Sequence, residues 1–84
     1  MLYYLLTCRS LTIAQKASKV LKGAGMPAAL VRTPLGVSKE GCGYSLRVRE
    51  RYLDGALASL RASELPPVRV FAELENGRYE ERRP

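Results

Sequence analysis

The sequence of 84 residues contains no histidine and no tryptophan, one phenylalanine and two cysteines. The lack of histidine excludes the usual zinc and haem ligand sets and the Ser–His and Cys–His pairs of nucleophilic catalysis. The two cysteines do not form a Cys-x-x-Cys motif. We therefore expect no cofactor and no bound metal, and a core built from Leu, Val, Ala and Tyr.

Long hydrophobic runs are also missing. The first residues, 1–6, lack the basic region of a secretory signal, and the apolar run stops at Thr7. No run approaches the roughly 20 residues that a membrane-spanning helix needs. We therefore expect a cytoplasmic protein without membrane contact, whose cysteines are reduced thiols rather than a disulfide framework.

The net charge is +6, which fits an ordinary solvated surface or attraction to an acidic protein, an anionic small molecule or nucleic acid. Basic residues are spread along the chain, and the aromatic residues are not interleaved with them as stacking platforms. Nucleic acid is therefore not an expected partner. A chain this short is one domain by default and is often helped by oligomerisation.

Hydrophobic periodicity predicts the element order β-α-β-β-α-β. Two starts are possible for the first helix, one with Ser10 as the N-cap and one with Thr12 and Gln15 as a capping box, and Gly23 and Gly25 favour its end. In the third strand, alternation places Tyr44 on a buried face with two other apolar residues, and Ser45 on a polar face with two arginines. The expected strands are 2–8, 28–32, 44–49 and 68–74, and the expected helices are 11–24 and 50–63. Residues 1–75 are then one domain and residues 76–84 a charged C-terminal tail.

This order is typical of an α+β, ferredoxin-like sandwich, a four-stranded antiparallel sheet with two helices on one face. The expected strand order is 4-1-3-2. The end of the first strand and the start of the third then lie at the same edge of the sheet. The fold alone does not decide the activity.

The segment 33–43 joins two predicted strands and places Cys42 between Gly41 and Gly43. Glycine has no Cβ, so the backbone around this thiol is open and a partner can approach it closely. Such a setting suits a thiol that must meet another macromolecule. The alternative is a plain hairpin loop in which the cysteine is incidental.

The predicted topology brings Cys8, at the end of the first strand, near Cys42. Adjacent strands lie about 4.7–4.9 Å apart, within the Cα separation of about 4.4–6.8 Å that a disulfide requires. Arg9, the start of the first helix and Lys39 would lower a thiol pKa from its ordinary value of about 8.5. Alternatively, Cys8 is a buried strand-end residue that behaves as a small hydrophobe.

Several features occur together between Tyr3 and about Leu60. They are Tyr3-Tyr4-Leu5-Leu6-Thr7, Ser10, Ala17, Lys19-Val20-Leu21-Lys22, Gly25-Met26-Pro27, Thr33-Pro34, Ser38, Cys42-Gly43 and Leu46-Arg47. This set resembles a family of small bacterial domains named as selenium/sulfur carrier protein-like. The Pro…Ser…Cys-Gly segment is the most specific part of the resemblance.

The resemblance implies that Cys42 is the functional thiol and that Pro34, Ser38 and Gly43 shape its loop, to which the residue pattern adds Gly41. It implies a non-enzymatic carrier that holds a persulfide or selenide on Cys42 for transfer between donor and acceptor proteins. It does not extend to Cys8.

Two other functions stay open at this point. One is a structural or regulatory interaction module that uses the 33–43 loop, or an edge strand that pairs with a partner or a second copy. The other is a metal chaperone, because two thiolates can hold a soft monovalent ion.

Overall fold

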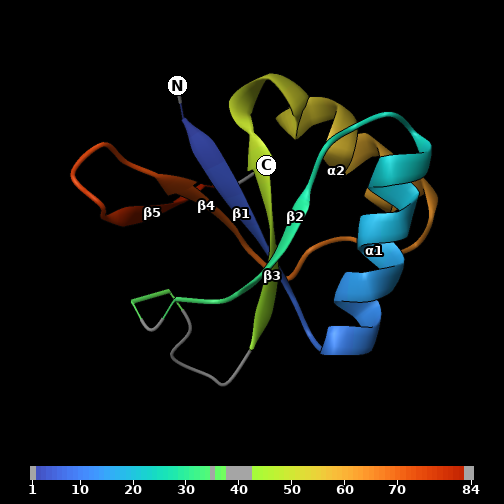
Figure 1. Cartoon of the computed structure of the whole chain (residues 1–84), viewed down its shortest axis with the longest axis horizontal. Helices are drawn as coiled ribbons and strands as arrows, with labels where there is room; N and C mark the ends of the chain where they lie inside the picture. The colour runs from blue at the N-terminus through green and yellow to red at the C-terminus, as the bar shows by residue number, and fades with distance from the viewer. Residues whose placement is uncertain (1, 35, 38–42, 83–84) are drawn as a thin grey trace.

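An antiparallel sheet of five strands forms the body of the molecule (Figure 1). The structure is a computed structural model, and it describes residues 2–34, 36–37 and 43–82. Its elements are β1 (Tyr3–Cys8), α1 (Leu11–Gly23), β2 (Ala29–Arg32), β3 (Tyr44–Arg49), a 3₁₀ turn (Glu50–Tyr52), α2 (Leu53–Ala62), β4 (Val70–Glu73) and β5 (Tyr79–Arg82).

The strands lie in the order β2-β3-β1-β4-β5, and each neighbouring pair is antiparallel. The first four strands thus have the neighbours that the sequence predicted. The prediction of four strands is wrong, because residues 79–82 of the expected tail form β5 on the outer side of β4. Over the described residues, the architecture is an α+β fold with two α-helices and a five-stranded sheet, in place of the expected four-stranded ferredoxin-like sheet.

A turn and one aromatic ring explain β5. Gly77 takes a φ of 82°, which glycine adopts without strain, and Asn76 Oδ1 accepts a hydrogen bond of 3.0 Å from the Arg78 N–H. The returning chain then places Tyr79 against a small apolar cluster on the sheet. The other three residues of β5 are charged, so the segment lacks the alternation that predicts a strand.

Both helices pack on one face of the sheet. Ser10 caps α1, the first of the two predicted starts, and its Oγ accepts a hydrogen bond of 3.2 Å from the Ile13 N–H. α2 is shorter than predicted, because Glu50–Tyr52 forms a 3₁₀ turn and no side chain caps the helix. The main core comprises Tyr4, Leu6, Cys8, Ala14, Ala17, Leu21, Leu46, Val48, Ala56, Leu57, Leu60, Val70 and Ala72.

The opposite face carries a second, smaller cluster. Leu5, Val37 and Phe71 are buried there, and Val31 and Tyr79 pack against them. Ser45, which alternation placed on a polar face, is fully buried as well. This face is therefore partly covered, because Val37 of the chain after β2 and the Tyr79 side chain of β5 pack on it. Neither helix in the described ranges has the length and hydropathy needed to cross a membrane.

Candidate functional site

The two ends of the 33–43 segment are joined where they leave the sheet. The Thr33 N–H donates a hydrogen bond of 2.9 Å to the Gly43 carbonyl, which continues the β2–β3 ladder by one pair. Beside it, the hydroxyls of Thr33 and Ser45 share a hydrogen bond of 2.6 Å. Both side chains are buried. The base of the segment therefore has a defined width and a satisfied pair of buried hydroxyls.

Val37 anchors the first part of this segment on the sheet. Its N–H donates a hydrogen bond of 3.0 Å to the Pro34 carbonyl and closes a turn. Its side chain is 6% exposed and packs in the cluster with Leu5 and Phe71. The chain after β2 therefore turns toward the face opposite the helices before it returns to β3.

Cys8 lies at the same end of the sheet as the base of the 33–43 segment, but its side chain points into the main core. Its side chain is 4% exposed, and its Sγ donates to the Leu6 carbonyl at 3.6 Å. Cys8 is the register partner of Tyr44, which follows Cys42 by two residues in the sequence. The end of β1 and the start of β3 therefore meet as predicted (Figure 1).

Four predicted site residues lie outside the described residues: Cys42, Ser38, Lys39 and Gly41. The predicted juxtaposition of the two thiols therefore stays a prediction.

The remaining predicted residues have distinct positions. Pro34 is half-buried and supplies the carbonyl of the turn. Gly43 has a φ outside the left-handed region, and within the described chain a Cβ there would meet no atom within 4 Å. The backbone at Gly43 therefore does not require glycine. Arg9 is exposed and borders a surface hollow of about 410 Å³ with Ile13 and residues 64–68. Its predicted effect on a thiolate is untested.

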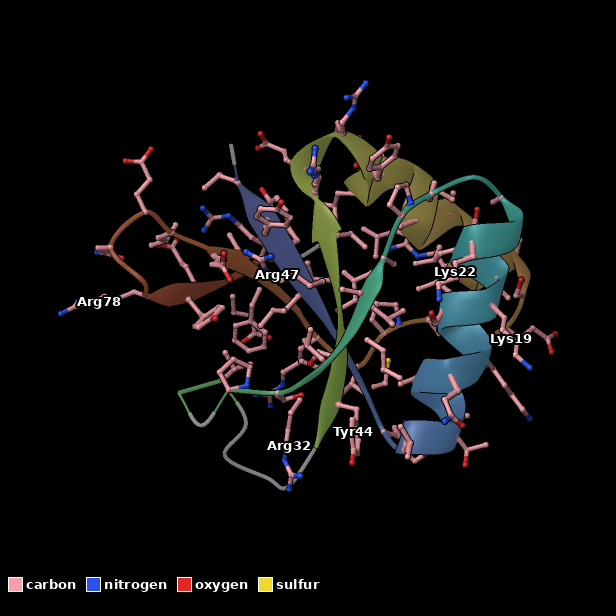
Figure 2. All side chains as sticks on the ribbon, in the orientation of Figure 1. Lys19, Lys22, Arg32, Tyr44, Arg47 and Arg78 are labelled. Atoms are coloured by element: carbon pink, nitrogen blue, oxygen red, sulfur yellow. The ribbon has the colours of Figure 1, made fainter. Side chains whose placement is uncertain are left out.

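The sequence did not reveal Arg32, which lies at the same end of the sheet as Cys8. It ends β2, is exposed, and is the register partner of Tyr44. Its Cζ lies 6.0 Å from the centre of the Tyr44 ring, within the range of a cation–π contact (Figure 2). A permanent positive charge thus lies beside the start of β3. Only the strand pairing reveals it, because the two residues are twelve positions apart in the sequence.

The sequence also did not reveal a network of polar side chains at the other end of the sheet. The Arg47 guanidinium donates two hydrogen bonds to Glu73, at 2.7 and 3.3 Å, and its Cζ lies 3.6 Å from the centre of the Tyr3 ring. The Tyr79 hydroxyl donates to Glu73 Oε1 at 3.3 Å. These residues come from β3, β4, β1 and β5, so the network of side chains connects four strands.

The ion pair between Arg47 and Glu73 shifts the pKa of each partner in the direction that favours its charged form. The hydrogen bond to Glu73 raises the pKa of Arg47, and the hydrogen bond from Arg47 lowers the pKa of Glu73. Burial raises the pKa of Tyr79. Tyr3 begins β1 and Cys8 ends it, so the polar network around Arg47 and Glu73 lies at the opposite end of the sheet from Cys8. This network stabilises the sheet and is not part of the candidate site. Across the described ranges, no group of three or more His, Cys, Asp or Glu side chains is placed to hold a metal ion.

Residues 3–72 match the model of a protein family described as "Putative Se/S carrier protein-like". The chain belongs to this family. The match begins with β1 and ends inside β4, so the carrier-like family region includes the 33–43 segment and excludes β5. Family membership indicates interaction with partner proteins. No curated protein and no solved structure matches the chain significantly.

Proposed function

We propose that this protein carries sulfur or selenium, holding it as a persulfide or selenide on Cys42 between a donor and an acceptor protein. The observation that carries the proposal is family membership over residues 3–72, a range that contains the Gly41-Cys42-Gly43 sequence. The closed base of the segment supports it, because the hydrogen bonds at Thr33 hold the two ends of the thiol-bearing chain at one edge of the sheet.

Loading is assigned to Cys42 rather than to Cys8. The Cys8 side chain is 4% exposed and packs among core residues, so a donor protein cannot reach its sulfur without opening the core. In the loading step, the Cys42 thiolate attacks the outer sulfur of a donor persulfide. The donor's S–S bond breaks, the donor leaves as a thiolate with the electron pair, and Cys42 becomes a persulfide.

A second step follows if the two thiols come within reach, as the topology predicts. The Cys8 thiolate attacks the inner sulfur of the Cys42 persulfide. The bond between the two sulfurs of the persulfide breaks, hydrosulfide leaves with the electron pair, and a Cys8–Cys42 disulfide forms. A thiol reductant then restores both cysteines. Support comes from the Cys8–Tyr44 register, two residues from Cys42.

Intact-mass spectrometry of anaerobically purified protein tests the proposal. The protein is treated with glutathione persulfide, and the Cys42→Ser and Cys8→Ser variants are treated in parallel. Wild type and Cys8→Ser are both expected to gain one sulfur atom at first, while Cys42→Ser gains none. Accumulation of the adduct in Cys8→Ser, with a disulfide replacing it in wild type, is expected for the coupled step.

Equal sulfur loading of Cys42→Ser and wild type would refute the carrier function. A wild-type protein that never acquires sulfur on Cys42, while Cys42→Ser keeps its protein partners, would favour the interaction module instead.

A further inference from the structure

The net positive charge of the protein comes entirely from its first 39 residues. They contain six Lys and Arg and no Asp or Glu, whereas residues 40–84 contain eight of each kind. In the described part of this region, the basic side chains lie on or beside α1 and β2, which pack against each other. The side of the molecule formed by α1 and β2 is therefore electropositive.

Among the described strands, β2 pairs with β3 alone and is therefore an open edge of the sheet. In an antiparallel pair, each residue directs both of its backbone groups either to its partner strand or away from it, in alternation. Thr33 faces β3, as its bond to Gly43 shows, so Val31 and Ala29 face β3 too. The N–H and C=O groups of Leu30 and Arg32 therefore point outward, where another strand can pair with them.

A hollow lies beside this edge, on the helix side. It has a volume of about 380 Å³ and is lined by Gln15, Ser18, Lys19, Lys22 and Leu30. Leu30 is 38% exposed, although it faces the same way as the core residue Leu46 with which it pairs. Figure 2 shows both lysines on α1 and Arg32 at the end of β2. An apolar side chain, two ammonium groups and open backbone groups thus lie together.

We infer that this edge, comprising β2 and the hollow with Lys19 and Lys22, binds an extended, acidic segment of a partner protein. The partner segment adds a strand to β2 through Leu30 and Arg32, as in β-augmentation. In a strand every second side chain lies on the same face, so side chains opposite Leu30 and Arg32 face the lysines. The segment therefore carries Asp or Glu at alternate positions. The inference does not depend on what Cys42 carries.

Two other occupants fit the edge less well. Outward N–H and C=O groups pair with a polypeptide backbone, whereas nucleic acid has no matching ladder. A second copy joined through β2 would place the Arg32 and lysine charges of the two chains near one another, which is unfavourable. The charge of this side therefore favours an acidic partner chain.

The test is an NMR titration of the ¹⁵N-labelled full-length protein with a synthetic heptapeptide in which Glu alternates with Val and Thr. The control peptide has Gln in place of each Glu. We expect the acidic peptide to shift the amide signals of Leu30 and Arg32 and the control peptide to bind more weakly. The double variant Lys19→Gln/Lys22→Gln should bind the acidic peptide about fivefold more weakly, as expected for the loss of two exposed charge pairs.

Lys16→Gln is the matched control, because Lys16 is exposed on the same helix but does not line the hollow. It should leave the affinity unchanged. Leu30→Pro removes an outward N–H, which an edge strand tolerates, and should abolish binding while preserving the dispersed spectrum.

An effect of Lys16→Gln as large as that of the double variant would overturn the inference, because binding would then be unspecific. Absence of shifts at Leu30 and Arg32 would also overturn it. So would binding of a short single-stranded RNA at these amides without peptide binding. Shifts of these amides with protein concentration alone would identify a second copy as the occupant instead.

Discussion

Replacing Thr33 by Val is expected to lower the free energy of unfolding by about 1–3 kcal/mol. Val has nearly the same shape as Thr, so the packing changes little. The variant removes the partner of the Ser45 hydroxyl, 2.6 Å away, in a place where the Ser45 side chain is fully buried. A hydroxyl that is buried without a hydrogen bond has lost its bonds to water and gained none in return. The free-energy cost of this desolvation sets the size of the expected destabilisation.

A double-mutant cycle separates this pair from its surroundings. Ser45→Ala should also destabilise the protein, because it leaves the Thr33 hydroxyl, 8% exposed, without its partner. Thr33→Val combined with Ser45→Ala removes both polar groups, so it should be clearly less destabilising than the sum of the two single changes.

Urea unfolding followed by circular dichroism measures all four proteins, and an unchanged m-value confirms that the same transition is compared. If the two single effects simply add in the double variant, the hydroxyls do not stabilise each other and the account of the segment's base is wrong.

Three further predictions concern single sites, each measured by urea unfolding. Ser10→Ala removes the cap of α1 and should cost about 1 kcal/mol, with Thr12→Ala as a control of little effect; equal effects would contradict the assigned cap. Because Arg47 lowers the pKa of Glu73 below its ordinary 4.5, the charged Glu73 stabilises the folded state above that pH, and this contribution is lost as the pH falls through the lower folded pKa. Glu73→Gln should therefore be less stable than wild type at pH 7, with the difference shrinking below pH 4; a difference that persists in acid would contradict this. Gly43→Ala should leave stability unchanged or raise it by up to about 1 kcal/mol, and a clear loss would show that glycine is needed there.

Local sequence signals predicted the elements whose side chains repeat regularly. The strand 44–49 has the predicted bounds, because its apolar residues alternate without interruption. β4 is shorter than the predicted 68–74, since the Thr7 hydroxyl accepts the Arg69 N–H at 2.9 Å and replaces a bond of the regular ladder. β5 could not be predicted, because its one aromatic residue, Tyr79, packs against a cluster that includes Leu5 and Val37, which lie far from it in the sequence.

The position of the site could be predicted better than its surroundings. Topology alone placed the end of β1 beside the start of β3, and the Cys8–Tyr44 register confirms this. The burial of Val37 and Ser45 could not be foreseen, because it depends on how the chain after β2 folds over the sheet. Similarly, the Arg32–Tyr44 contact depends on strand register, which a single sequence does not determine.

The two outer strands of the sheet, β2 and β5, form its two rims, and these differ in a way that bears on solubility. On the β5 rim, Glu80 pairs with Arg82, and Glu81 pairs with Arg69 at 3.8 Å, so its acidic groups are already neutralised within the chain. Three charged residues in four also make β5 a poor template for a foreign strand. End-to-end stacking of β5 on the β2 rim of the next molecule would generate an endless ribbon, because such a contact never closes on itself. The internal pairing on β5 reduces the electrostatic gain from that contact, which disfavours the growth of such a ribbon.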